Sequence, residues 1–352
     1  MQMRTLGRTG IKVSPYCLGT MMLGAWGNPD HAEGVAMVHR ALDAGINFVD
    51  TADTYSDGES ETILGAALAG RRDDVVVSTK AHFPMGTDPN RAGNSRRWLT
   101  RAVEDSLRRL DTDWIDVLQV HRPDPDTDID KTLSTLSDLV HAGKVRVVGT
   151  STFPAEQIVH AQWVADARGH VRPRVEQAPY SILNRAVEAA VLPTCQQFGM
   201  GVTAWSPLSS GWLTGRYRSA GDVDLASGRR AIQAHKFDPD SAGNRAKLDA
   251  VTALADLADE LDVSMTHLAI AFVLAHPGVT AAILGPRTGN QLDDLLAGAD
   301  VTLDDATLDR IDEIATPGVT LNPTDSDYTP PALADPAQRR RPAAERIAQE
   351  AA

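Results

Sequence analysis

Four polar residues that can act together in proton transfer follow apolar, β-branched-rich segments: Asp50, Tyr55, Lys80 and His121. The segments span residues 46–50, 75–80 and 114–121. A phenol is a poor proton donor at neutral pH unless a nearby positive charge stabilises the phenolate, and Lys80 can provide that charge. Asp50 can supply the counter-ion that a buried ammonium group requires. We predict a relay in which Asp50 holds Lys80, Lys80 tunes Tyr55, and His121 orients a substrate oxygen.

The chemistry that suits this group is the reduction of a carbonyl compound. An oxygen bound between Tyr55 and His121 would be polarised and protonated, which leaves the carbonyl carbon open to a nucleophile. The sequence has no metal-ligand spacing and no candidate nucleophilic serine or cysteine, so a hydride from a cofactor is the simplest nucleophile. Two alternatives stay open: an aldolase-like barrel enzyme in which Lys80 forms a Schiff base, and a protein that binds the cofactor only as a sensor.

The strands that must position these residues alternate with helices along the chain. We expect strands at 16–20, 46–50, 75–80, 114–120, 145–150, 174–178, 200–205 and 279–284. Helices are expected at 30–44, 59–69, 95–110, 129–142, from Pro154 onward, 187–198, 244–261, 264–275 and 289–297. Several strands are apolar on both faces, as is typical of parallel strands covered by helices.

Eight strand-then-helix units favour an α/β fold, a (β/α)8 TIM barrel, with an N-terminal β-hairpin cap over residues 4–14 and long loops at the C-terminal face. In such a barrel the ends of neighbouring strands meet at one rim, which would bring the four residues together. The alternative is an open doubly wound sheet. That fold usually carries a glycine fingerprint after its first strand, and residues 18–24 do not match it.

A single barrel domain is predicted over residues 1–317. Residues 318–352 are rich in Pro, Asp and Ala, and we expect a C-terminal tail that is partly disordered or folded over the barrel mouth. Residues 208–242 form a long polar stretch rich in Gly and Arg, and long loops in compact domains are usually functional.

The composition restricts the partners and the compartment. The 352 residues carry a net charge of −13, which argues against a nucleic-acid or anionic-membrane partner because both would repel the protein. Cys17 and Cys195 match neither a disulfide framework nor a zinc spacing, so we expect reduced thiols and no metal site. No apolar signal segment begins the chain, and no run approaches the ~20 apolar residues that span a bilayer. We therefore expect a cytoplasmic protein, with no prediction for its oligomeric state.

Several motifs in the same order resemble those of the aldo-keto reductases. They are Leu6-Gly7-Arg8-Thr9-Gly10, Phe48-Val49-Asp50-Thr51-Ala52-Asp53-Thr54-Tyr55, Ser78-Thr79-Lys80, Gln177-Ala178-Pro179-Tyr180, Trp205-Ser206-Pro207-Leu208-Ser209-Ser210-Gly211 and Leu284-Gly285-Pro286-Arg287. The resemblance implies NADP(H) lying extended across the top of the barrel. It also implies that Tyr55 is the proton donor, Lys80 its pKa-lowering partner, Asp50 the counter-ion of Lys80, and His121 the residue that orients the carbonyl group.

The resemblance also implies a set of residues that bind the cofactor. Ser151 and Gln177 would hold the nicotinamide carboxamide, and Trp205 would stack on the nicotinamide ring. The pyrophosphate would lie on the loop that contains Ser206, Leu208, Ser210 and Gly211. Gly285, after the last strand, would also belong to the cofactor-binding residues. Arg287 and Gln291 would meet the adenosine 2′-phosphate, which predicts NADPH over NADH. Two positions depart from the family pattern, because Thr152 and Leu295 stand where the family often has asparagine.

The expected function is NADPH-dependent reduction of aldehydes or ketones to alcohols, with an NADP(H)-binding redox sensor or regulatory subunit as the alternative. The substrate would be a small carbonyl compound. Candidates for the pocket wall are Trp26, His82, Trp212 and Tyr328, which lie in loops or near strand ends. Such loops vary most within a fold, so the substrate itself is not predicted.

Overall fold

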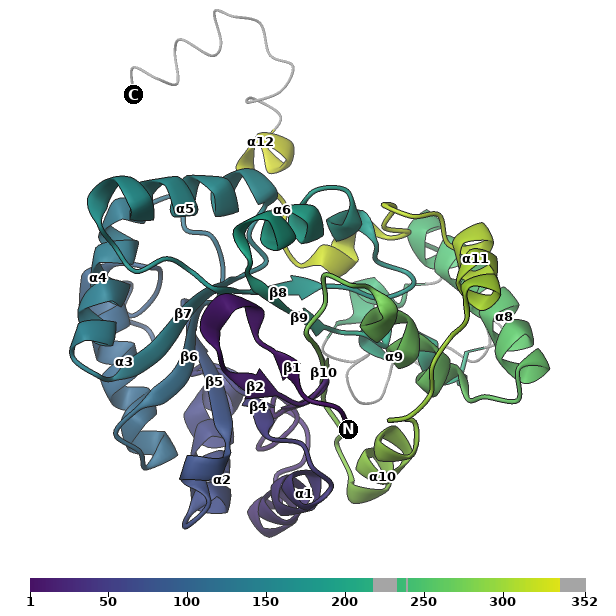
Figure 1. Cartoon of the computed structure of the whole chain (residues 1–352), viewed down its shortest axis with the longest axis horizontal. Helices are drawn as coiled ribbons and strands as arrows, with labels where there is room; N and C mark the ends of the chain where they lie inside the picture. The colour runs from purple at the N-terminus through teal and green to yellow at the C-terminus, as the bar shows by residue number, and fades with distance from the viewer. Residues whose placement is uncertain (218–232, 239, 336–352) are drawn as a thin grey trace, which may run out of the picture.

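The computed structural model describes residues 1–217, 233–238 and 240–335, and within them eight parallel strands close into a barrel. The strands follow one another around the barrel in the order β10-β3-β4-β5-β6-β7-β8-β9 (Figure 1). Their bounds are β3 Tyr16–Gly19, β4 Phe48–Asp50, β5 Val76–Ala81, β6 Ile115–Val120, β7 Val145–Ser151, β8 Val175–Pro179, β9 Gly201–Trp205 and β10 Ala281–Leu284. The predicted TIM barrel is confirmed.

Helices surround the barrel, as the apolar periodicity of their sequences predicts (Figure 1). They are α1 His31–Asp43, α2 Glu59–Leu68, α3 Arg96–Leu110, α4 Ile129–His141, α5 Ala155–Arg168, α6 Val191–Phe198, α8 Ala242–Glu260, α9 Met265–Ala275, α10 Gly289–Ala297, α11 Asp305–Ile314 and α12 Pro331–Ala334. The helix expected at 187–198 is shorter, because residues 186–188 form a separate 3-10 turn before α6. Helix α11 was not predicted, although Asp304 caps it by accepting a hydrogen bond from the Thr307 amide.

An N-terminal hairpin closes the bottom of the barrel, as predicted. Strands β1 (Arg4–Thr5) and β2 (Lys12–Val13) pair antiparallel. The Arg8 amide donates to the Gly199 carbonyl at 2.9 Å, just before β9 begins. Gly7 has a φ of 55°, and a Cβ atom there would lie 2.3 Å from the Gly201 nitrogen. Only glycine lets the hairpin approach the strand so closely.

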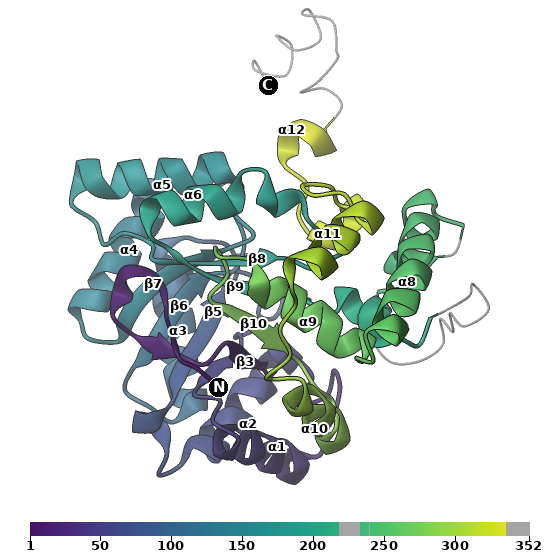
Figure 2. The same ribbon diagram turned by 45° about the vertical axis from the view of Figure 1, so that its right-hand side comes forward.

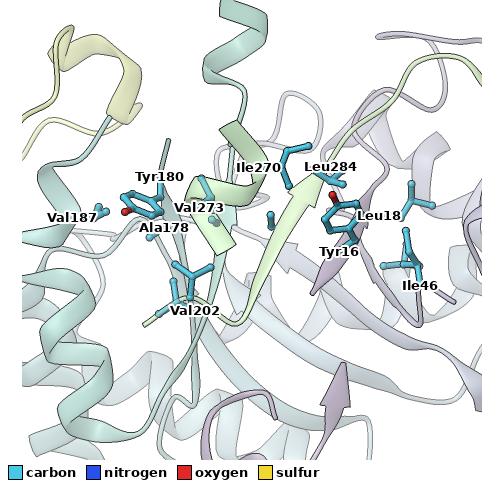
Figure 3. Close-up of a cluster of buried hydrophobic side chains, with 14 of the residues drawn as sticks. Tyr16, Leu18, Ile46, Ala178, Tyr180, Val187, Val202, Ile270, Val273 and Leu284 are labelled. Carbon is cyan, nitrogen blue, oxygen red and sulfur yellow. The ribbon is translucent and has the colours of Figure 1, made fainter. Parts of the chain in front are cut away.

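The hydrophobic core has two layers. A small inner cluster fills the barrel, with Cys17, Phe48, Val117, Val175 and Ala281 pointing inward from five strands. The larger layer lies between the strands and the helices. Figure 3 shows part of it, where side chains of α9 lie among those of β3, β8, β9 and β10. Helix α9 is buried on nearly every side because α8 packs against it as well.

The C-terminal segment returns to the barrel after α11, which packs beside α8 (Figure 2). The Leu321 amide donates to the Leu183 carbonyl at 3.1 Å. A short 3-10 helix over Pro323–Ser326 follows, where buried Asp325 lies 3.0 Å from the Nζ of buried Lys247. Residues 319–327 therefore fold onto the barrel, whereas residues 336–352 of the predicted tail and residues 218–232 and 239 of the predicted loop lie outside the described part of the chain.

Candidate active site

The ends of β4 and β5 bring three of the four predicted residues into hydrogen-bond contact. Lys80 Nζ lies 2.6 Å from Asp50 Oδ2, 2.7 Å from the Thr51 carbonyl oxygen and 3.3 Å from the Tyr55 hydroxyl. The side chain of Lys80 is fully buried, so an unpaired charge would be costly there. Both β4 and β5 end at this rim because the strands are parallel and in register, with Asp50 beside Ser78. The relay predicted from the sequence is therefore geometrically possible.

Burial and charge determine the protonation of this group. Burial raises the pKa of Tyr55, and the positive charge of Lys80 offsets only part of that effect, so the pKa stays above the ordinary value of 10.0. Burial lowers the pKa of Lys80, but the negative charge of Asp50 and the contact with Tyr55 outweigh it, and the net direction is upward. At neutral pH the phenol is protonated and the amine is charged. Tyr55 is thus in the state of a proton donor.

His121 completes the group from the end of β6. The centre of its ring lies 6.0 Å from that of Tyr55 and 4.7 Å from that of Phe83, edge to face in both cases. Burial, followed by the positive charges of Lys80 and Arg122, holds the pKa of His121 well below its usual 6.5. Its buried Nδ1 has no hydrogen-bond partner within the described chain. A neutral imidazole in this wall has one N–H to donate to a substrate oxygen.

An open cavity of about 910 Å³ at the C-terminal face of the barrel is lined by Asp50, Tyr55 and His121. Met22, Trp26, Phe83 and Pro84 line it near Tyr55 and His121. Residues from the loops after β9 and β10 line the remainder: Trp205, Ser206, Leu208, Ser210, Gly211, Gly285, Arg287 and Gln291. A cavity of this size with apolar walls and a few polar groups is typical of a site for a cofactor together with a small substrate.

The loop after β9 has the conformation expected of an anion-binding loop. Ser206, Ser209, Ser210 and Gly211 all have positive φ angles, of 56°, 47°, 58° and 105°. The Ser210 amide donates to Ser206 Oγ at 2.9 Å, which holds the turn. Nothing lies within 4 Å of a Cβ atom placed on Gly211, so the backbone is open toward the cavity. Successive amides in such turns form concave sites for phosphate groups.

A second site suited to an anion lies at the start of α10. Arg287 is exposed, and Thr288 caps the helix by accepting from the Gln291 amide. The Gln291 side chain accepts from the Arg287 amide at 2.8 Å, which fixes the turn. A guanidinium group beside a helix N-terminus favours a phosphate. The residues present therefore fit a dinucleotide with a phosphate on its adenosine end.

The ends of β7, β8 and β9 carry the residues predicted to hold the nicotinamide. Gln177 Nε2 donates to Asp50 Oδ1 at 2.9 Å, which links this end to the relay. Ser151 is buried and donates to the Gln177 carbonyl at 3.1 Å. Trp205 lines the cavity, and its buried Nε1 has no partner among the described residues. Thr152 has a φ of 59°, a conformation that disfavours β-branched side chains and suits asparagine better.

Glu176, next to Gln177, is a buried acid beneath this end of the site. It accepts hydrogen bonds from the Thr150 hydroxyl and from the Phe153 amide. Burial raises the pKa of Glu176 from its ordinary 4.5 to about 8, although these hydrogen bonds and Arg122 act in the opposite direction. Glu176 is therefore mostly neutral at pH 7 in the folded chain and ionised in the unfolded chain.

This difference predicts a pH dependence of stability. Between about pH 4.5 and 8 the folded chain binds the Glu176 proton and the unfolded chain does not, so stability falls as pH rises. This loss of stability amounts to at most about 1.4 kcal/mol per pH unit, and the substitution Glu176→Gln should remove it. Urea unfolding at several pH values should show the variant gaining stability relative to wild type as pH rises. Parallel curves for the two proteins would contradict the assignment.

Comparisons with known proteins agree with this fold. The sequence profile of the Aldo/keto reductase family matches residues 15–316. The chain belongs to this family. Two of its relatives are "Uncharacterized oxidoreductase YrpG" of Bacillus subtilis, 36% identical over 89% of this chain and 96% of the relative, and "Aldo-keto reductase YhdN" of the same organism, 34% identical over 84% and 88%. A "Probable voltage-gated potassium channel subunit beta" of Oryza sativa is 38% identical over 86% of this chain and 92% of the relative.

Three of the four pocket residues predicted for this aldo-keto reductase lie away from the cavity wall. Trp212 is 1% exposed, stacks on Phe237 and donates from Nε1 to the Lys236 carbonyl, so it is a packing residue. His82 contacts Asn94 at 2.8 Å through Nδ1. Tyr328 interacts with Gln157 and the charge of Glu156, at the start of α5. These three side chains therefore contact neighbouring loop and helix residues and do not line the cavity.

Trp26 does line the cavity, and its ring centre lies 6.2 Å from that of Tyr55. The sequence prediction missed Met22, Phe83 and Arg122, which also line it. Phe83 and Arg122 come shortly after the ends of two predicted strands, so the sequence could have indicated that they lie at the rim of the barrel. None of the described helices is long and apolar enough to cross a membrane, and the described residues contain no cluster of metal-binding side chains.

Proposed function

We propose that this aldo-keto reductase catalyses the NADPH-dependent reduction of aldehydes or ketones to alcohols. The observation that carries the proposal is the chain of contacts from Asp50 through Lys80 to the Tyr55 hydroxyl, at the floor of a cavity that His121 also lines. A protonated phenol beside a charged amine is suited to give a proton to a developing alkoxide. The membership of the chain in the Aldo/keto reductase family supports an oxidoreductase.

The residues of the chain have distinct tasks in this reaction. The Tyr55 hydroxyl and the His121 N–H bind the carbonyl oxygen and polarise the bond. As the oxygen gains negative charge, Tyr55 gives up its proton, and Lys80 stabilises the phenolate at 3.3 Å. Asp50 keeps Lys80 charged and in place. NADPH, when bound, supplies the hydride to the carbonyl carbon.

The cofactor would be held by three groups of residues. Ser151, Gln177 and Trp205 would orient the nicotinamide, while the loop of Ser206, Leu208, Ser210 and Gly211 would bind the pyrophosphate with its amides. A Cβ atom placed on Gly285 would lie 3.7 Å from the Gly19 carbonyl oxygen, so this position leaves room beside the loop. Arg287 and Gln291 would bind the 2′-phosphate.

Loss of the exposed guanidinium should abolish the preference for NADPH. In Arg287→Ala the 2′-phosphate loses a charged hydrogen-bond donor, so we expect the Kd for NADPH to rise about 10- to 100-fold while that for NADH stays nearly constant. Fluorescence titration with both cofactors measures this. Arg310→Ala in α11, where Arg310 pairs with Glu260 2.7 Å away, is the matched control. An unaltered NADPH/NADH ratio would show that other residues hold the 2′-phosphate.

The aldolase-like alternative is disfavoured by the contacts of Lys80. A Schiff-base lysine must be unprotonated to attack a carbonyl group. Here Nζ contacts Asp50, the Thr51 carbonyl and Tyr55, which accounts for the three N–H donors of an ammonium group. Borohydride in the presence of a carbonyl substrate should leave Lys80 unmodified.

A second candidate is a regulatory protein that binds NADP(H) and turns over little, and the relative named as a potassium channel subunit favours it. The two functions separate in one experiment. A reductase oxidises NADPH in the presence of a panel of aldehydes that includes reactive dicarbonyl compounds. A regulatory protein binds NADPH with similar affinity and oxidises none of it with any member of the panel.

A further inference from the structure

Arg122 is a cation in the wall of the cavity that the reaction described above does not use. It directly follows His121, and its Nη1 donates to the His121 carbonyl at 2.6 Å. The guanidinium carbon lies 5.4 Å from the centre of the Phe83 ring and 5.9 Å from that of Trp205, and both rings line the cavity. The side chain thus reaches across the mouth of the barrel, between the substrate end and the expected nicotinamide end.

Arg122 is partly buried and, unlike several buried cations elsewhere in the described chain, has no ion-pair partner among the described residues. Lys80 pairs with Asp50 at 2.6 Å, Lys247 with Asp325 at 3.0 Å, and Arg185 with Glu188 at 2.8 Å. A partly buried charge without a counter-ion carries a desolvation cost that a bound anion would offset.

Asp327 and Glu176 are the two carboxyl groups whose charges act on Arg122, and neither of them neutralises it. Asp327 lies in the cavity wall but is paired with Lys236 at 2.6 Å. Glu176 is held by Thr150 and the Phe153 amide, and its raised pKa of about 8 keeps it mostly neutral at pH 7. The substrate end of the cavity therefore has a surplus of positive charge.

We propose that Arg122 binds a carboxylate group of the carbonyl substrate, so that the preferred substrates are aldehydes or ketones that carry an acid group beyond the reacting carbon. This deepens the proposed function and rests on it. Within the described part of the chain, Arg122 donates one side-chain hydrogen bond, to the His121 carbonyl, and a guanidinium group matches a carboxylate with two parallel hydrogen bonds. The flanking rings of Phe83 and Trp205 would hold the guanidinium plane in position.

The test compares two substrates that differ in one charge: 4-carboxybenzaldehyde and its methyl ester, with 3-carboxybenzaldehyde to vary the position of the acid. Wild type should reduce at least one acid with a higher kcat/KM than the ester. In Arg122→Met the KM for the preferred acid should rise about 10- to 100-fold, and the KM for the ester should change less than about threefold. Arg146→Met, which removes an exposed charge at the opposite end of the barrel, should leave both unchanged.

Equilibrium binding keeps this proposal separate from the proposed function. The Kd of the corresponding carboxybenzyl alcohol for the NADP⁺-loaded protein, measured by calorimetry, should rise in Arg122→Met, and the Kd for NADPH should not. Acid binding through Arg122 without reduction of any aldehyde would support the anion site and overturn the reductase. Equal loss of acid and ester, no preference for either acid, or weaker NADPH binding in the variant would overturn the anion site.

Discussion

The phenylalanine variant of the proton donor (Tyr55→Phe) should lose carbonyl reduction while still binding the cofactor. Removal of the hydroxyl leaves the developing alkoxide without its proton donor, for which we expect kcat to fall about 100- to 10,000-fold. The ring contacts with Trp26 and His121 remain, so the cavity keeps its shape. NADPH affinity should stay within a few fold, because the hydroxyl acts only on the substrate oxygen.

Single-turnover oxidation of bound NADPH measures the chemical step, and fluorescence titration measures cofactor binding. The matched control is Tyr16→Phe, since Tyr16 is another buried tyrosine but lies in the outer core layer on β3. That variant should reduce aldehydes at the wild-type rate. If Tyr55→Phe turns over like wild type, another group supplies the proton.

The variant Lys80→Met should lose both activity and stability. The buried carboxylate of Asp50 loses its counter-ion, and breaking one side of a buried pair costs about 3–5 kcal/mol. The phenolate of Tyr55 also loses the charge that stabilises it, so the rate of reduction should fall as well. Urea unfolding at pH 7 and single-turnover kinetics measure the two effects.

A double variant separates the structural role of Lys80 from its chemical role. In Asp50→Asn/Lys80→Met no unpaired charge remains, so most of the lost stability should return. Activity should stay low because nothing stabilises the phenolate. Full activity in either variant, or no loss of stability in the single variant, would contradict the relay.

The barrel and the contacts among Asp50, Lys80 and Tyr55 were predictable from the sequence because their signals are local. Each strand is a short apolar run, and a parallel barrel places the residue at the end of one run beside the end of the next. Asp50 and Lys80 could thus be paired without knowledge of any side-chain conformation. The hairpin was predictable for the same reason, since turn glycines bound it.

The directions of side chains in the loops were not predictable. Trp212 and Tyr328 lie in segments where no periodicity indicates which side faces the cavity, and their burial depends on distant partners, Phe237 for one and α5 for the other. Arg122 illustrates the reverse case. Its position after His121 was known from the sequence, but its lack of an acidic partner within the described residues depends on where Asp327 and Lys236 come to lie.

The pKa of Tyr55 also required the structure. The sequence suggests that a neighbouring lysine lowers it, and Lys80 does act in that direction. The larger effect is burial, which is set by the surrounding cavity walls and raises the pKa. The Tyr55 phenol therefore remains protonated at neutral pH and can donate its proton when a carbonyl substrate is reduced.

The most direct test of hydride transfer to a carbonyl group uses NADPH deuterated at C4 of the nicotinamide ring on the transferred face. The protein is mixed with this cofactor and an aldehyde, and the alcohol is analysed by mass spectrometry. The account predicts one deuterium on the carbinol carbon of the product from wild type and almost no product from Tyr55→Phe. Tight binding of the labelled cofactor with no deuterated alcohol from any aldehyde of the panel would contradict it.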